Sequence, residues 1–270
     1  MRKTIICTFS LVLFIVAGLF YGCSDNSTSP SDQNGSVMLY LTDAPADFDG
    51  VFIVVDKVEV NANANASNSD NGWITLNSTT HTYNLMSLRN GVEVAIADTA
   101  LAAGTYAQVR LVLGSGSYVV VGGVKFNLNV SSNLQAGIRI AHKFTVSVNS
   151  TANLTIDFNV NRSIKVIGSG SFTLQPSIRI IDTDNSGSIS GMIMPLDADA
   201  IVWTKTASND TVTAYPDSSG YFKLSALPPD NGYSVNVHAQ NIGFNDTTIT
   251  NVNVIAQKDK DLGTITLSNQ

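Results

Sequence analysis

The chain has 270 residues, a formal net charge of −6 and a pI of about 4.9. An acidic chain lacks the basic surface that displaces counterions from phosphates, so the composition excludes a nucleic-acid partner. Hydrophobic residues make up 44% of the chain and charged residues 13%, which is enough apolar material for a sizeable core. Helix-forming runs are scarce while β-branched residues and glycine recur, and the sequence therefore predicts an all-β protein.

The N-terminal segment has the composition of an export signal. Two basic residues, Arg2 and Lys3, precede an apolar run that ends at Gly22-Cys23. This run is shorter than the ~20 residues of a comfortable membrane span, and polar residues follow it at once. It resembles a lipoprotein signal peptide over residues 1–22, which implies cleavage before Cys23 and a lipid on the Cys23 sulfur. An uncleaved N-terminal anchor is the alternative.

The remaining features of this region concern compartment and tethering. Cys7 lies inside the leader and Cys23 would carry lipid, so the mature chain is left without a disulfide framework or a cysteine metal cluster. Residues 23–34 are polar and contain serine and proline, which predicts a disordered tether. Ser24 and Asp25 do not resemble the strongest inner-membrane retention signal. We therefore expect an outer-membrane lipoprotein, on the periplasmic face or the cell surface.

Two apolar runs, residues 37–41 and 51–60, open the first predicted domain as strands. Pro45 lacks a backbone donor and cannot sit inside a ladder, so the stretch between the runs is predicted to be a structured connection. Carboxylates crowd this connection at Asp43, Asp47 and Asp49. Because Ca²⁺ takes oxygen ligands, these three residues are the candidate metal site, with Ca²⁺ as the candidate ion, and no other cofactor is expected. The alternative is that Asp43 and Asp47 cap turns through the backbone.

Further along the first domain, small polar residues over 61–72 predict a loop tip, and Trp73 follows it as a candidate ligand-binding surface. Residues 111–113 are apolar throughout, which indicates burial on both faces of a strand. Residues 118–121 and 124–130 predict a hairpin across Gly122-Gly123. Many short strands separated by turns favour a β-sandwich with Greek-key connections.

Six motifs follow one another through this region: LTDAPAD, NLMSLRNG, ALAAGTYAQVRLVL, SNLQAGIRI, LTIDFNVNRSI and LQPSIRIID. They resemble, in the same order, the motifs of one family, the bacterial lipoprotein domain called domain of unknown function 4382. The resemblance covers residues 35–182 and implies architecture and location, because the family has no assigned activity.

A polar boundary precedes a second predicted domain, residues 187–270. Seven short strands in this length predict a small Greek-key sandwich. The stretches GSISGMIMP, TAYPDSSGYFKLSALPPDNGYSVNVHAQNIGF and LGTITL resemble the carboxypeptidase-regulatory-like, transthyretin-like domain. That resemblance implies a stalk or docking module and nothing catalytic. At the boundary, Asp182 and Asp184 match the first half of a calcium loop, but Ile193 stands where a bidentate glutamate is needed, so we interpret it as a hydrated linker.

Motifs for catalysis are missing from the sequence. It contains no G-x-S-x-G elbow, no glycine-rich phosphate loop and no H-E-x-x-H. The three histidines, His81, His142 and His238, show no ligand spacing and are interpreted as surface or strand-face residues. Aspartate-hydroxyl dipeptides resemble the O-glycosylation acceptor pattern of Bacteroidota secreted proteins, and they mark Thr99, Thr211 and Thr247.

Taken together, these features predict a lipid-anchored envelope or cell-surface protein that acts as a non-catalytic binding or structural module. Its expected partners are the membrane, through the lipid anchor, and a glycan or envelope protein. No catalytic residue is expected. Two alternatives stay open. One is an accessory or hydrolytic protein acting on envelope polysaccharide, which would need two carboxylates facing a cleft. The other is a passive surface spacer.

Overall fold

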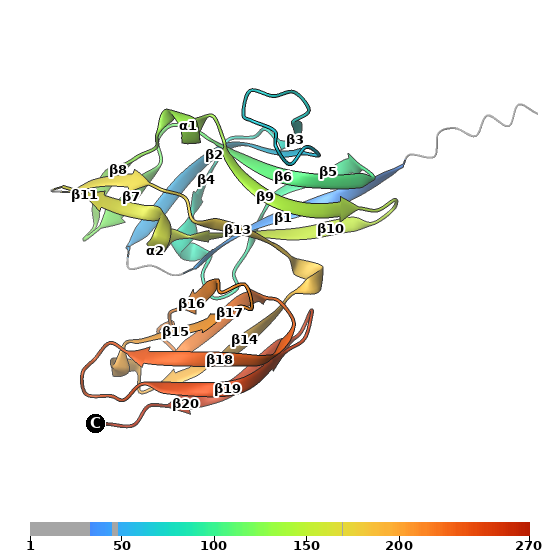
Figure 1. The fold of residues 1–270 in the computed structure, drawn as a ribbon. Helices are drawn as coiled ribbons and strands as arrows, with labels where there is room; N and C mark the ends of the chain where they lie inside the picture. The colour runs from blue at the N-terminus through green and yellow to red at the C-terminus, as the bar shows by residue number, and fades with distance from the viewer. Residues whose placement is uncertain (1–32, 45–47, 169) are drawn as a thin grey trace, which may run out of the picture. The chain divides into compact units, whose positions relative to one another are not determined.

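The computed structural model of the protein describes residues 33–44, 48–168 and 170–270 (Figure 1). The predicted signal peptide, Cys23 and Asp47 lie outside the described residues. From residue 33 onward, none of the described helices is long and apolar enough to cross a bilayer. The described chain is built almost entirely of strands, which confirms the predicted all-β fold.

One sheet of the first sandwich has four strands, in the order β13-β10-β1-β5. β1 lies between β5, which is antiparallel to it, and β10, which is parallel to it. A parallel neighbour needs a long crossover, and here more than a hundred residues separate the two strands. The strands are β1 (Asn34–Ala44), β5 (Val94–Ala102), β10 (Thr151–Asn159) and β13 (Ile178–Asp182).

The facing sheet has nine strands and is ordered β11-β12-β8-β7-β2-β6-β9, with β3 and β4 also paired to β2. β2 is its longest member and pairs with β3, β4, β6 and β7 along its length. The strands are β2 (Gly50–Asn61), β3 (Ile74–Asn77), β4 (His81–Asn84), β6 (Gly104–Leu113), β7 (Tyr118–Val121), β8 (Val124–Asn129), β9 (Ile138–Val146), β11 (Ile164–Ile167) and β12 (Ser171–Leu174).

Short helices join some of these strands: η1 (Leu85–Ser87), α1 (Ser132–Gln135) and α2 (Val160–Ser163). Two of them begin at asparagine caps, because the Asn84 side chain accepts from the Met86 N–H and that of Asn159 accepts from the Arg162 N–H. Alternate residues of the facing strands fill the core between the sheets. Leu39, Ile156 and Phe158 are among its fully buried members.

Burial on both faces, predicted for residues 111–113, is incomplete, because Leu111 and Leu113 are buried in the core while Val112 between them is half-buried. The second face of β6 is covered nearer the start of the strand, where Gln108 and Arg110 are buried beneath the loop of residues 62–73. The Gln108 amide donates to the Asn63 carbonyl at 2.9 Å. This loop, expected to be an exposed tip, therefore lies on the outer face of the sheet, and its Ala66 is fully buried.

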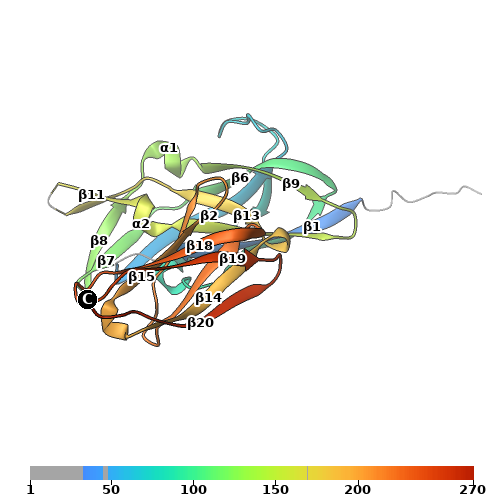
Figure 2. The same ribbon diagram turned by 60° about the horizontal axis from the view of Figure 1, so that its bottom comes forward.

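The second sandwich contains the seven predicted strands, in sheets ordered β17-β14-β20 and β16-β15-β18-β19 (Figure 2). β14 and β20 are parallel neighbours, whereas β18 lies antiparallel between β15 and β19. The elements are η2 (Thr183–Asn185), β14 (Gly187–Met194), η3 (Leu196–Ala198), β15 (Ala200–Lys205), β16 (Thr211–Ala214), β17 (Tyr221–Leu227), β18 (Asp230–Ala239), β19 (Thr247–Val254) and β20 (Asp259–Thr266).

The turn before β17 shows how the sequence sets local structure in this sandwich. The Asp217 carboxylate accepts from the N–H groups of Ser219 and Tyr221, so the aspartate closes the turn. Gly220 has a φ of +87°, and a Cβ there would meet the Ile193 carbonyl oxygen at 2.5 Å. Glycine is therefore required at this position both by conformation and by space.

Candidate functional site

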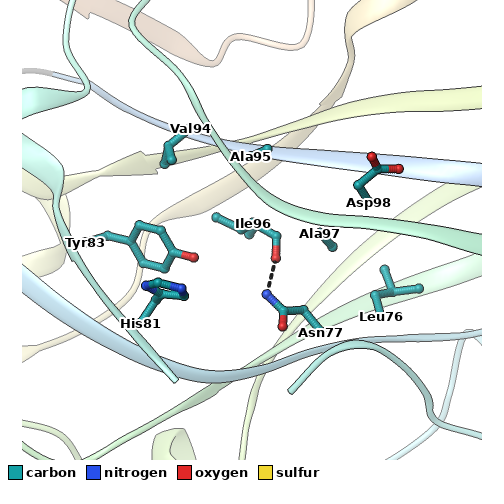
Figure 3. Close-up of a pocket in the computed structure, with 9 residues that line it drawn as sticks. All are labelled: Leu76, Asn77, His81, Tyr83, Val94, Ala95, Ile96, Ala97 and Asp98. Carbon is teal, nitrogen blue, oxygen red and sulfur yellow. Dashed lines mark hydrogen bonds between the residues drawn. The ribbon is translucent and has the colours of Figure 1, made fainter. Parts of the chain in front are cut away.

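An open cleft of about 400 Å³ lies in the first sandwich where β3 and β4 approach the edge strand β5 (Figure 3). Its walls combine apolar strand residues with a few polar side chains, the composition typical of ligand sites. The lining residues are Leu76, Asn77, His81, Tyr83, Val94, Ala95, Ile96, Ala97 and Asp98.

Side-chain hydrogen bonds between strands of the two sheets hold the walls of the cleft in place. The Asn77 amide donates to the Ile96 carbonyl at 2.8 Å, and the Thr99 hydroxyl donates to the Leu76 carbonyl at 2.7 Å. β5 pairs with β1 along one edge only, so its other edge has no partner strand. These side-chain bonds satisfy backbone carbonyls, those of Ile96 and Leu76, that the strand ladders do not. The strand positions on both sides of the cleft are thereby fixed relative to each other.

Two rings and a carboxylate supply the polar chemistry of the cleft. His81 and Tyr83 stand two residues apart on β4, so both side chains lie on the same face of the strand. Their ring centroids are 5.9 Å apart. Burial raises the pKa of Tyr83, so its hydroxyl stays protonated and can donate a hydrogen bond at neutral pH. Figure 3 shows the Tyr83 hydroxyl pointing towards Ile96, with Asp98 on the far side. Asp98 is exposed and is the one carboxylate among the lining residues.

This arrangement can bind a polar ring compound. The rings of His81 and Tyr83 offer apolar surface, while the Tyr83 hydroxyl and the Asp98 carboxylate offer a donor and an acceptor. Hydrolysis of a glycosidic bond ordinarily takes two carboxylates on either side of that bond. Among the lining residues the cleft presents a single carboxylate, that of Asp98.

The predicted calcium ligands lie in different surroundings. Asp43 is buried, and its Oδ1 accepts from the Val160 N–H at 3.1 Å. Asp49 is exposed, and its Oδ2 accepts from the Gly123 N–H at 2.9 Å. The part of the chain that the structure describes contains no group of three or more histidine, cysteine or acidic side chains that could hold a metal. Calcium binding by this loop stays a prediction, which melting temperatures measured with calcium and with chelator would test.

Trp73, the predicted ligand surface, is half-buried. Its indole N–H donates to the Ser67 carbonyl at 2.9 Å, and its ring lies 4.0 Å from the guanidinium carbon of Arg110. One ring face is therefore occupied by a cation–π contact with the sheet. The ring helps to fix the loop of residues 62–73, and a ligand role for its remaining surface stays a prediction.

The predicted glycosylation sites are all half-buried residues of strands. Thr99 lies within β5, and its hydroxyl already donates to Leu76. Thr211 and Thr247 are the first residues of β16 and β19. Their modification is likewise untested.

The cleft was missed by sequence reasoning, which treated His81 as an ordinary surface residue. One signal was present, because His81 and Tyr83 stand two apart in a short strand and so share a face. The approach of β4 to β5, however, is a tertiary contact between sheets. The other two histidines lie elsewhere: the His238 Nδ1 pairs with Asp246 at 2.9 Å in the second sandwich, and burial lowers the pKa of His142.

Comparison with solved structures gives only distant similarity. The TIE protein of Bacillus anthracis has 12% identity and a TM-score of 0.25, and the alignment covers 88% of this chain but 34% of that one. The minor pilin GBS52 of Streptococcus agalactiae has 13% identity and a TM-score of 0.25, with coverage of 86% and 96%. A putative adhesin from Bacteroides ovatus has 8% identity and a TM-score of 0.24, with coverage of 94% and 99%.

These low TM-scores carry no argument about function. No curated protein matches the chain. A family model described as domain of unknown function (DUF4382) matches residues 34–176. The match includes more than half of the 270 residues and takes in the cleft, and the chain therefore belongs to the DUF4382 family.

Proposed function

We propose that the protein is a lipid-anchored, non-catalytic binding module of the bacterial cell surface, and that the cleft between β3, β4 and β5 binds a glycan. The observation that carries the proposal is the side-chain set of this cleft. It joins two neighbouring rings to one donor and one acceptor without a second carboxylate.

The proposed anchor rests on the sequence. A basic and apolar leader ends at Gly22-Cys23, and a polar stretch separates Cys23 from the start of β1 at Asn34. Stable anchoring takes more than one acyl chain, which a lipoprotein cysteine would provide. Labelling cells with a fatty-acid analogue should mark the wild type and leave Cys23→Ala unmarked.

We assign the second sandwich to the stalk or docking role that its carboxypeptidase-regulatory-like motifs imply. Its strands form two sheets around a core of their own, with Phe222 and Leu224 fully buried. The polar side chains of its turns, such as Asp217, are engaged with their own backbone. The proposed anchor at Cys23 precedes the first sandwich, so the second sandwich follows it along the chain, where a rigid unit of this kind suits docking to a partner.

Glycan binding by the ectodomain tests the proposal. We expect the wild-type chain from Ser24 onward to bind specific glycans on an array. Tyr83→Ala and Asp98→Asn should each weaken that binding about tenfold or more, as expected when a ring or a hydrogen-bond partner is lost from a binding site. Tyr118→Ala is the matched control, because Tyr118 is a half-buried strand tyrosine on β7, outside the cleft. Equal losses in all three variants, or no glycan bound by the folded wild type, would count against the cleft.

A further inference from the structure

Two glycine-turned hairpins project from the same end of the nine-stranded sheet. β7 and β8 turn at Gly122-Gly123, and β11 turns into β12 around Gly168 and Gly170. β12 runs parallel to β8, with Phe172 opposite Leu128, so both turns precede the paired segment and point the same way. Figure 1 shows β7, β8 and β11 together at one end of the first sandwich. A Cβ added at any of the four glycines would meet no atom within 4 Å, so side-chain space at both turns is open to solvent.

Both turns are flanked by exposed aliphatic side chains. Val121 and Val124, on either side of the first turn, are 39% and 55% exposed, and Val166 and Ile167, before the second, are 62% and 54% exposed. Large exposed aliphatic residues number ten in the described chain, and four of them lie on these two hairpins. Such a concentration marks an interaction surface, whereas single exposed aliphatics need no explanation. We call residues 121–124 and 166–168 the hairpin tips.

Lysines adjoin the apolar residues on both tips. Lys125 follows Val124 and Lys165 precedes Val166, and both side chains are exposed. The Lys125 ammonium lies 3.7 Å from the centroid of the Tyr118 ring, on the outer face of the sheet. Asp49 lies at the same end, where its carboxylate accepts from the Gly123 N–H. The tips thus present two lysines beside their apolar residues in a protein whose net charge is −6.

We infer that the hairpin tips insert into the interface of a lipid bilayer that carries anionic headgroups. Exposed valine and isoleucine side chains gain by leaving water for the boundary between headgroups and acyl chains. Lysines next to them keep their ammonium groups at the level of the phosphates, where each adds electrostatic attraction. The inference concerns a surface remote from the glycan cleft and goes beyond the proposed function.

A bilayer fits the tips better than a second copy of the chain does. The four exposed side chains offer on the order of a few hundred Å² of apolar surface, against the ~800 Å² that each partner buries in a stable complex. Two narrow projections also lack the continuous, complementary surface of a protein interface. A fluid interface needs no such match of shape.

Vesicle co-sedimentation tests the inference, with the chain from Ser24 onward, which contains every described strand and both cores. We expect the wild type to sediment with phosphatidylcholine vesicles that contain phosphatidylglycerol. Val124→Ser/Ile167→Ser should weaken this binding about tenfold or more, because two inserted side chains are lost. Lys125→Gln/Lys165→Gln should weaken it and remove most of its salt dependence. The altered side chains are exposed, so the fold should be retained.

The matched control is Ile242→Ser/Ile255→Ser, which removes two exposed isoleucines, 85% and 57% exposed, from the second sandwich. Vesicle binding should be unchanged in this variant. The inference is overturned if the folded wild type ignores anionic vesicles, if the tip and control variants lose binding equally, or if sedimentation shows instead that the tips mediate a dimer of the chain.

Discussion

Replacing Arg110 with methionine should lower the free energy of unfolding by about 3 kcal/mol, because the change leaves a carboxylate buried without its cation. Arg110 and Glu59 are 8% and 6% exposed, and the Arg110 Nε donates to the Glu59 carboxylate at 2.8 Å. The same guanidinium donates to the Asn68 carbonyl at 2.8 Å and faces the Trp73 ring. Its loss should therefore also release the loop of residues 62–73.

Urea unfolding monitored by circular dichroism measures this effect, and two further variants interpret it. Arg162→Met removes an exposed arginine from the short helix α2 and should cost less than about 1 kcal/mol. Glu59→Met/Arg110→Met replaces both charges with apolar side chains and should recover most of the loss. A loss as large in the double variant as in Arg110→Met would mean that packing, and not the unpaired carboxylate, causes the destabilisation.

Phe222→Ala should destabilise the second sandwich by roughly 3–5 kcal/mol, the usual effect of removing a buried phenylalanine. Phe222 is fully buried on β17, and Phe158, 1% exposed on β10, is its counterpart in the first sandwich. We predict that the two sandwiches unfold independently, with the boundary near residues 183–187. Phe222→Ala should then shift one unfolding transition and Phe158→Ala the other.

The two tryptophans allow the transitions to be separated, since Trp73 lies in the first sandwich and Trp203 in the second. Fluorescence of the Trp203→Phe and Trp73→Phe backgrounds should follow one sandwich each. The Asn90 amide donates to the Tyr215 carbonyl at 3.2 Å and to the Tyr221 carbonyl at 3.4 Å. Because a hydrogen bond of this kind contributes only about 1 kcal/mol, we expect the two transitions to stay separate. If Phe222→Ala shifts the signal of Trp73 as much as that of Trp203, the sandwiches form one cooperative unit.

Local pattern was sufficient to predict much of the fold. The β7–β8 hairpin follows from alternation around Gly122-Gly123, and Asp217 and Gly220 specify their turn through short-range bonds and a positive φ. The parallel pairings were not foreseen, because β1 and β10 are joined by a long connection that has no local signature.

The surroundings of the polar residues were harder to predict than the strands. No local pattern marks Glu59 as a residue with a charged partner, yet β2 and β6 place it opposite Arg110. The loop of residues 61–72 has the composition of an exposed tip. Gln108 and Arg110 on β6, however, donate hydrogen bonds to its backbone carbonyls and hold it against the sheet. The cleft likewise depends on how far apart the two sheets lie at β5, and no residue pattern encodes that spacing.

Binding without turnover is the central claim, and one measurement addresses it most directly. A glycan retained by the wild-type ectodomain would be titrated by calorimetry, and the same mixture would then be analysed by mass spectrometry after long incubation. The account predicts saturable binding that Tyr83→Ala abolishes, with the glycan recovered at its original mass. Shortened glycan that appears with the wild type and not with Asp98→Asn would contradict it and identify the protein as a hydrolase.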